Sequence, residues 1–92
     1  MEKRIVILGA GESGTGSAVL ARTKGFDVFV SDIGKIKPHY KEILYNYEID
    51  WEEEQHTDRL ILNADEIIKS PGISDKSEIM QIIQKKEIPV IS

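Results

Sequence analysis

Apolar residues along this chain come in short runs that alternate with stretches of helical spacing. The run at 4–8, RIVIL, is continuous and ends at a glycine, which predicts a strand buried on both faces of a parallel sheet. Over 13–24, apolar and small residues recur at helical spacing, and Gly25 follows as a stop signal. Residues 27–32, DVFVSD, predict a second strand that ends on an acid.

The second half of the chain repeats this alternation. A helix is expected to begin at Pro38, because the fixed φ of proline suits a first helical turn. Thr57 is expected to cap the next helix, and Asp75 and Glu78 fit a capping box for the last one. The acidic residues 52–54 are interpreted as a solvated strand end. Further strands are predicted over 48–53, 65–70 and 88–92, and further helices over 56–64 and 79–86.

This order predicts an α/β fold of the Rossmann-like type. We expect a five-stranded parallel sheet in the order 3-2-1-4-5 with helices on both faces. Without an internal repeat or linker, residues 1–92 are expected to form a single domain. The chain stops at a buried-looking strand with no helix to cover it, so we expect this domain to be a fragment of a longer protein.

Composition and charge argue against several kinds of partner and site. The net charge is −4, and Lys and Arg are scattered without a basic stripe, which argues against nucleic acid as a partner. No apolar run approaches the roughly 18 residues of a membrane span, so no membrane partner is expected. Without cysteine the chain has no disulfide and no thiolate metal site, which suits the cytosol.

A glycine motif provides the first candidate for a binding site. Gly9, Gly11 and Gly14 match G-x-G-x-x-G directly between a predicted strand and a predicted helix. The first allows the tight turn, the second lets a diphosphate approach the backbone, and the third lets the helix pack on the sheet. Free N–H groups at the helix start favour an anion, and the hydroxyls of Ser13 and Thr15 either cap the helix or donate to phosphate.

Two further features belong to the same edge of the predicted sheet. Asp32 ends the second strand, where an acid either bonds a ribose hydroxyl or base edge, or caps the next turn. Ser70, Pro71 and Gly72 form a rigid turn after the fourth strand, which lies beside the first. The turn is either structural or a source of amides for a phosphate. The glycine motif and Asp32 alone fit a nicotinamide-dinucleotide domain of a dehydrogenase equally well, but the S-P-G turn and the Glu12–Ser13 pair weaken that alternative.

The combination resembles a known family. GAGESGTGSAVLARTKGFDVFVSD, followed by ILNADEIIKSPGIS, resembles the N-terminal domain of the Mur ligases, in particular the type that adds D-glutamate. The L-alanine-adding type is a near alternative within the family. An NAD(P)-binding domain and a nucleotide-sensing regulatory module are alternatives outside it.

The resemblance implies a three-domain ligase of cytoplasmic peptidoglycan precursor synthesis. Its N-terminal domain would bind the UDP part of UDP-N-acetylmuramoyl-L-alanine and hold no cofactor. The central domain would bind ATP and Mg²⁺, and the C-terminal domain would help to bind the amino acid. The catalytic residues and metal ligands would lie in those later domains, so that this chain binds but does not catalyse.

The resemblance also implies which residues face the ligand. Glu12 is expected to point to solvent, because a carboxylate weakens an anion site. Some relatives have Arg where this chain has Gly34, and Lys35 or Lys37 could replace that charge. His39 and His56 are interpreted as surface residues. The UDP-binding residues would be Gly11, Glu12, Ser13, Gly14, Thr15, Asp32, Ile33, Ser70, Pro71 and Gly72.

Overall fold

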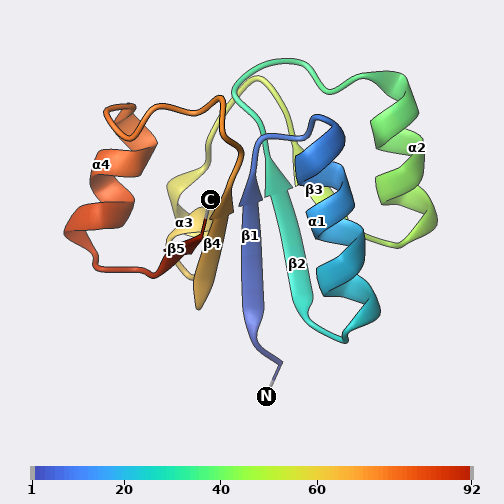
Figure 1. The fold of residues 1–92 in the computed structure, drawn as a ribbon, viewed down its shortest axis with the longest axis horizontal. Coiled ribbons are helices and arrows are strands. Elements are labelled where there is room, and N and C mark those ends of the chain that lie inside the picture. The colour runs from blue at the N-terminus through green and yellow to red at the C-terminus, as the bar shows by residue number, and fades with distance from the viewer. Residues whose placement is uncertain (1, 92) are drawn as a thin grey trace.

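The computed structural model describes residues 2–91 and has a parallel sheet with helices on both faces (Figure 1). In the described part of the chain, the sheet has five strands in the order β3-β2-β1-β4-β5. This confirms the predicted fold class and strand order. The elements are β1 (Arg4–Leu8), α1 (Glu12–Thr23), β2 (Asp27–Ser31), α2 (Pro38–Asn46), β3 (Asp50–Glu52), α3 (Asp58–Ile61), β4 (Glu66–Lys69), α4 (Glu78–Lys85) and β5 (Val90–Ile91).

Strand β1 lies at the centre of the sheet because its side chains are apolar in both directions. It pairs in parallel with β2 on one side and β4 on the other, and Leu8 lies opposite both Ser31 and Lys69. Successive side chains of a strand point to opposite faces. Ile5 and Ile7 therefore enter one core, and Val6 and Leu8 enter the other.

The two cores are covered by different helices. Helices α1 and α2 cover the face that carries Ile5 and Ile7, whereas α3 and α4 cover the opposite face (Figure 1). Burial of one such aliphatic side chain contributes roughly 1.5–3 kcal/mol, so both layers stabilise the sheet. The helical residues that enter the two cores are Ala18, Ala21 and Leu44 on one side and Ile61, Ile79, Met80 and Ile83 on the other.

Element boundaries differ from the predictions mainly in the second half of the chain. The third strand and the third helix are shorter than the predicted 48–53 and 56–64. The predicted capping box is wrong, because α4 starts one residue after Ser77, which makes no side-chain cap bond. Thr57 precedes α3 but also makes no cap bond, because its hydroxyl donates to Glu52. Ser92, the last residue of the predicted fifth strand, lies outside the described residues.

All strands point the same way, so their carboxyl ends meet at one edge of the sheet (Figure 1). In open α/β sheets, ligands bind outside this edge, at the point where the strand order reverses. Here that point lies between β1 and β4. None of the helices in residues 2–91 has both the length and the apolar composition needed to cross a bilayer.

Candidate functional site

The glycine loop, residues 9–15, joins β1 to α1 in a sharp turn. Gly9 has a φ of 96°, a left-handed conformation that favours glycine, and its N–H donates to the Ser31 carbonyl over 2.9 Å. A Cβ on Gly14 would collide with the Gly9 carbonyl oxygen. The turn and the close packing of α1 on the sheet therefore require glycine at both positions, which confirms the reasons given for them from the motif.

The outer side of the glycine loop is open. A Cβ on Gly11, which precedes the first residue of α1, would have no protein atom within 4 Å. Glu12 and Ser13 are exposed, and no side chain caps the first turn of α1. Thr15 is instead 3% exposed, and its hydroxyl donates to the Ala10 carbonyl over 3.3 Å. Thr15 therefore supports the loop from beneath, while its neighbours face solvent.

Asp32 fastens the glycine loop to the segment that follows β2. One carboxylate oxygen accepts the Ala10 N–H at 2.8 Å, and the other accepts the Gly34 N–H at 2.9 Å. Charge-assisted bonds of this kind are stronger than bonds between neutral groups. We call this pair of bonds the Asp32 clasp. It shows that Asp32 has the structural role considered for it, because the carboxylate holds the turn that follows β2.

The S-P-G turn, residues 70–73, lies against the glycine loop. A Cβ on Gly9 would lie 2.7 Å from the Cβ of Ser70, which shows how closely the two segments approach. The Ile73 N–H donates to the Ser70 carbonyl over 3.1 Å. The buried Lys69 ammonium donates to the Ile73 carbonyl over 2.8 Å. The prediction that the two segments are neighbours is therefore confirmed, and a buried lysine fixes the turn.

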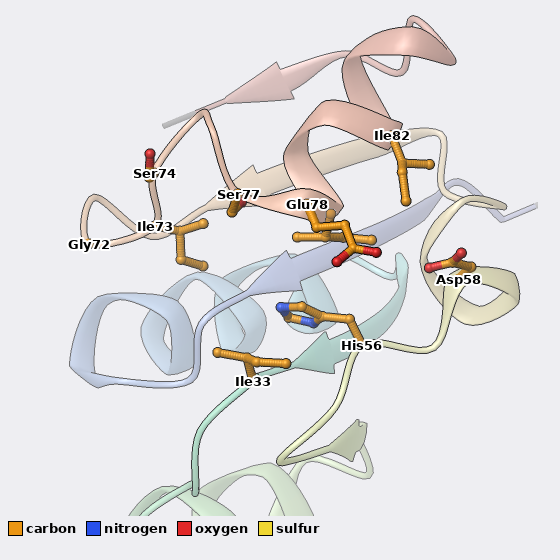
Figure 2. A pocket seen from close by; sticks show the side chains of 10 residues that line it. Ile33, His56, Asp58, Gly72, Ile73, Ser74, Ser77, Glu78 and Ile82 are labelled. Atoms are coloured by element: carbon orange, nitrogen blue, oxygen red, sulfur yellow. The ribbon is translucent and has the colours of Figure 1, made fainter.

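A pocket of about 500 Å³ opens on the α4 side of this edge (Figure 2). The segment after β2 supplies Ile33, which is 66% exposed and forms one wall. The S-P-G turn and the start of α4 form the facing wall, with His56 between them (Figure 2). We call this space the α4-side pocket; its lining residues are Ile33, His56, Asp58, Gly72, Ile73, Ser74, Ser77, Glu78, Ile79 and Ile82.

His56 is not the surface residue that the sequence indicated. Its side chain is half-buried, and Nδ1 lies 2.7 Å from the Ser31 hydroxyl oxygen. The same hydroxyl lies 2.8 Å from a Glu52 carboxylate oxygen. Glu52 also accepts the Thr57 N–H at 2.8 Å and the Thr57 hydroxyl at 2.6 Å. These four residues form one polar network, and its His56 side chain lines the α4-side pocket.

The interpretation of 52–54 as a solvated strand end is also wrong for its first two residues. Glu52 is only 8% exposed, because it belongs to β3 and faces Ser31 of the neighbouring strand. Glu53 accepts the Ile36 N–H at 2.9 Å and pairs with Lys41 at 2.7 Å. Glu54 remains exposed, as expected. Two of these three glutamates are therefore not solvated: Glu52 anchors the segment at Thr57, and Glu53 anchors the segment at Ile36.

The network shifts the titration of both of its ionisable groups. Burial raises the pKa of the Glu52 carboxyl, but the hydrogen bonds from Thr57 and Ser31 together outweigh burial and hold this pKa below the usual 4.5. Burial lowers the pKa of the His56 imidazole below 6.5, against the opposing effect of the carboxylates of Glu52, Asp32 and Asp58. At neutral pH, Glu52 is therefore charged and His56 is neutral.

Comparison with known proteins identifies the family to which this geometry belongs. A protein-family model described as the MurD N-terminal domain matches residues 4–79, which include the glycine loop, the Asp32 clasp and the S-P-G turn. The chain belongs to the MurD N-terminal domain family. A UDP-N-acetylmuramoylalanine–D-glutamate ligase of Bacteroides thetaiotaomicron is 58% identical over 90 residues, which are 98% of this chain and 20% of that protein. This chain therefore spans about a fifth of the length of such relatives.

Solved structures of Mur-type ligases share the same fold. A pseudomurein peptide ligase type C from Methanothermus fervidus superposes with a TM-score of 0.84 at 30% identity, covering 99% of this chain and 19% of that one. A UDP-N-acetylmuramate:L-alanyl-gamma-D-glutamyl-meso-diaminopimelate ligase from Neisseria meningitides superposes equally well at 25% identity, covering 100% of this chain and 29% of that one.

In this MurD N-terminal domain, the predicted site residues gather at one edge but in two groups. The glycine loop meets the S-P-G turn at Gly9 and Ser70, while Ile33 and Gly72 line the α4-side pocket. The network of Ser31, Glu52 and His56 was not predicted from the sequence. A signal for it exists, since Ser31 and Glu52 end adjacent strands in register, and polar residues at such positions are candidates for contact.

Proposed function

We propose that this MurD N-terminal domain binds the UDP part of UDP-N-acetylmuramoyl-L-alanine. The observation that carries the proposal is the contact between the glycine loop and the S-P-G turn at the point where the strand order reverses. In open α/β sheets, ligands bind at this point, and a glycine-rich turn after the first strand is a common site for a diphosphate. The names of the related ligases supply the substrate.

The diphosphate would lie over the start of α1. Gly11 leaves open space there, the N–H groups of the first helical turn are not capped by a side chain, and the helix dipole favours an anion. Ser13 is exposed and can donate its hydroxyl. Gly72 is exposed on the neighbouring turn and would offer its amide. Backbone dipoles can thus bind an anion although the net charge is −4.

The nucleoside would extend from the diphosphate toward the segment after β2. Ile33 offers an exposed apolar surface to a base, beside the α4-side pocket. Asp32 lies between this wall and the glycine loop, so a ribose contact would be made by a carboxylate already engaged in the clasp. Lys35 and Lys37 remain candidates for the positive charge that Gly34 does not provide.

The proposal for the parent protein is an ATP-dependent, amide-forming ligase of cytoplasmic peptidoglycan synthesis. ATP and Mg²⁺ would bind to its central domain, and an acyl phosphate on the substrate carboxylate would be attacked by the amine of D-glutamate. The products of this reaction would be the amide, ADP and phosphate. In this scheme the present chain would bind the substrate and contact the other domains, and it would take no part in catalysis.

Calorimetric titration with UDP and with NADH tests the proposal. We expect UDP to bind and NADH not to bind. Gly11→Val should abolish UDP binding, because the new methyl groups occupy the space through which the phosphates approach. Gly16→Val is the matched control, since Gly16 is equally open but lies farther along α1, and it should leave UDP binding in place. Unchanged UDP affinity in a folded Gly11→Val variant would refute the loop assignment.

A further inference from the structure

The S-P-G turn rests on a buried charge. Among the lysines of residues 2–91, Lys69 alone is buried, with 8% of its surface exposed. Lysine is rarely buried unless its charge is paired, because an ammonium loses its hydration. In this part of the chain, the carboxylate within 4 Å of Lys69 Nζ is that of Asp75, at 3.6 Å, and the Asp75 side chain is 73% exposed. Such a pair with a solvated partner contributes little, so it does not explain why the charge is buried.

The Lys69 ammonium fixes the course of the turn at Ile73. It donates to the Ile73 carbonyl oxygen over 2.8 Å, and the Ile73 N–H donates to the Ser70 carbonyl over 3.1 Å. Both polar groups of the Ile73 backbone are therefore held by the protein. The Ile73 side chain points from the turn toward the glycine loop (Figure 2), where a Cβ on Gly9 would lie 3.4 Å from its Cδ1. By holding Ile73, Lys69 determines how the turn meets the glycine loop.

Holding the Ile73 carbonyl also sets the direction of the next amide. The peptide bond between Ile73 and Ser74 is trans, so its C=O and N–H point in opposite directions. Since the carbonyl is turned toward the buried Lys69 Nζ, the Ser74 N–H points away from it, and Ser74 is exposed. Within residues 2–91, neither this N–H nor that of Gly72 donates to a protein acceptor. The turn therefore carries two free donors with a positive charge behind them.

We propose that Lys69 is a positioning residue for the diphosphate, which holds the S-P-G turn in the form that presents the Gly72 and Ser74 amides and lends its charge to their outer side. This inference rests on the proposed function, because it concerns the same UDP ligand. Lys69 acts from beneath the turn and does not need to touch the ligand. Its charge would favour an anion in a chain whose net charge is −4. A bound diphosphate would in turn compensate the buried ammonium, which the exposed Asp75 does only weakly.

The effect on the turn is tested without any ligand. Lys69→Met keeps an unbranched side chain of similar length and removes the ammonium. Nitrogen-15 relaxation reports the fast motion of single amides, and we expect the order of the Gly72 and Ser74 amides to fall in this variant. Lys76→Met, the same change at an exposed lysine of the following segment, should leave both amides as ordered as before. Equal order of these amides in Lys69→Met and the unaltered protein would overturn the inference even if UDP binds.

The effect on binding is tested by titrating UDP and uridine, which lacks the diphosphate, into the same variants. Lys69→Met should weaken UDP binding about tenfold, the usual effect of losing one charge-assisted interaction, and uridine binding by about twofold or less. Lys76→Met should change either affinity by about twofold or less. Lys69→Gln, which is also neutral but remains polar, repeats the test if the methionine variant does not fold.

The ratio of the two affinities separates positioning of the diphosphate from general support of the fold. An equal loss of UDP and uridine binding in Lys69→Met would overturn the inference, and so would unchanged UDP affinity. Both results leave the proposed function standing. Absence of UDP binding to the unaltered protein would overturn the proposed function and this inference together.

Discussion

The glycine loop and the α4-side pocket lie at the same edge of the sheet but are built from different parts of the chain. The loop consists of backbone from one short segment, and the Asp32 carboxylate is the main side chain that fastens it. The pocket depends on side chains from the ends of β2 and β3, the segment before α3 and the start of α4. One half of the edge is set by local conformation and the other by long-range packing.

This difference indicates how each half responds to substitution. A backbone turn tolerates many side chains but not an added Cβ at the positions where segments touch, such as Gly14. A side-chain network tolerates local backbone changes but not the loss of a hydrogen-bond partner, because a buried group is then left unsatisfied. The predictions below test this distinction, from the largest expected effect to the smallest.

Gly14→Ala should give the largest loss of stability. The new Cβ would collide with the Gly9 carbonyl, which is backbone and cannot move without displacing β1 or α1. We expect the free energy of unfolding to fall by about 3 kcal/mol, measured by urea denaturation. Gly16→Ala, two positions along the same helix in open space, should raise it by roughly 0.5–1 kcal/mol. Equal effects at both positions would contradict the close packing of α1 on the turn.

Glu52→Gln should be the most damaging change in the side-chain network. One Glu52 oxygen accepts the Ser31 hydroxyl and the Thr57 N–H, so the amide nitrogen must lie toward the Thr57 hydroxyl, which then has to accept instead of donate, and all three bonds lose their charge assistance. We expect a loss of roughly 2–3 kcal/mol in the free energy of unfolding. Glu54→Gln, the same change at an exposed neighbour, should alter it by less than about 0.5 kcal/mol. A neutral result at Glu52 would show that the network contributes little to stability.

Asp32→Asn separates the structural role of this residue from the role in UDP binding that is proposed for it. The amide retains one acceptor and loses the other, so one bond of the Asp32 clasp is broken and the free energy of unfolding should fall by about 1–2 kcal/mol. UDP affinity is measured in parallel by calorimetry. A fall in affinity without any change in stability would show that Asp32 acts on the ligand and that the clasp is dispensable.

Acid should weaken the pocket side of the molecule in two stages. His56 has a folded pKa below its unfolded value of 6.5, so the unfolded state takes up its proton first and stability falls as the pH drops below about 6.5. Glu52 has a folded pKa below 4.5, so its contribution is present above that value and is lost as the pH falls through the folded pKa. Melting temperatures between pH 8 and 3 should show both stages, and His56→Phe should remove only the first.

The sequence predicted the backbone half of the site well and the side-chain half poorly. β1 matches its predicted range, β2 differs by one residue, and the conformational roles of Gly9 and Gly14 hold, because each depends on a short run of neighbouring residues. His56 and Glu52 were misread because their burial depends on the register that places β3 beside β2. Thr57 was misread for the same reason, since its hydroxyl serves Glu52 instead of a helix end. Local patterns do not encode such partners.

The Asp32 clasp has a consequence for the kinetics of binding. Because the protein itself supplies both hydrogen bonds to the carboxylate, the glycine loop is held in shape before any ligand arrives. An anion bound at this edge, as proposed, would therefore require no prior ordering of the backbone. The rate of association should then follow diffusion and ionic strength, without a slow phase of loop rearrangement.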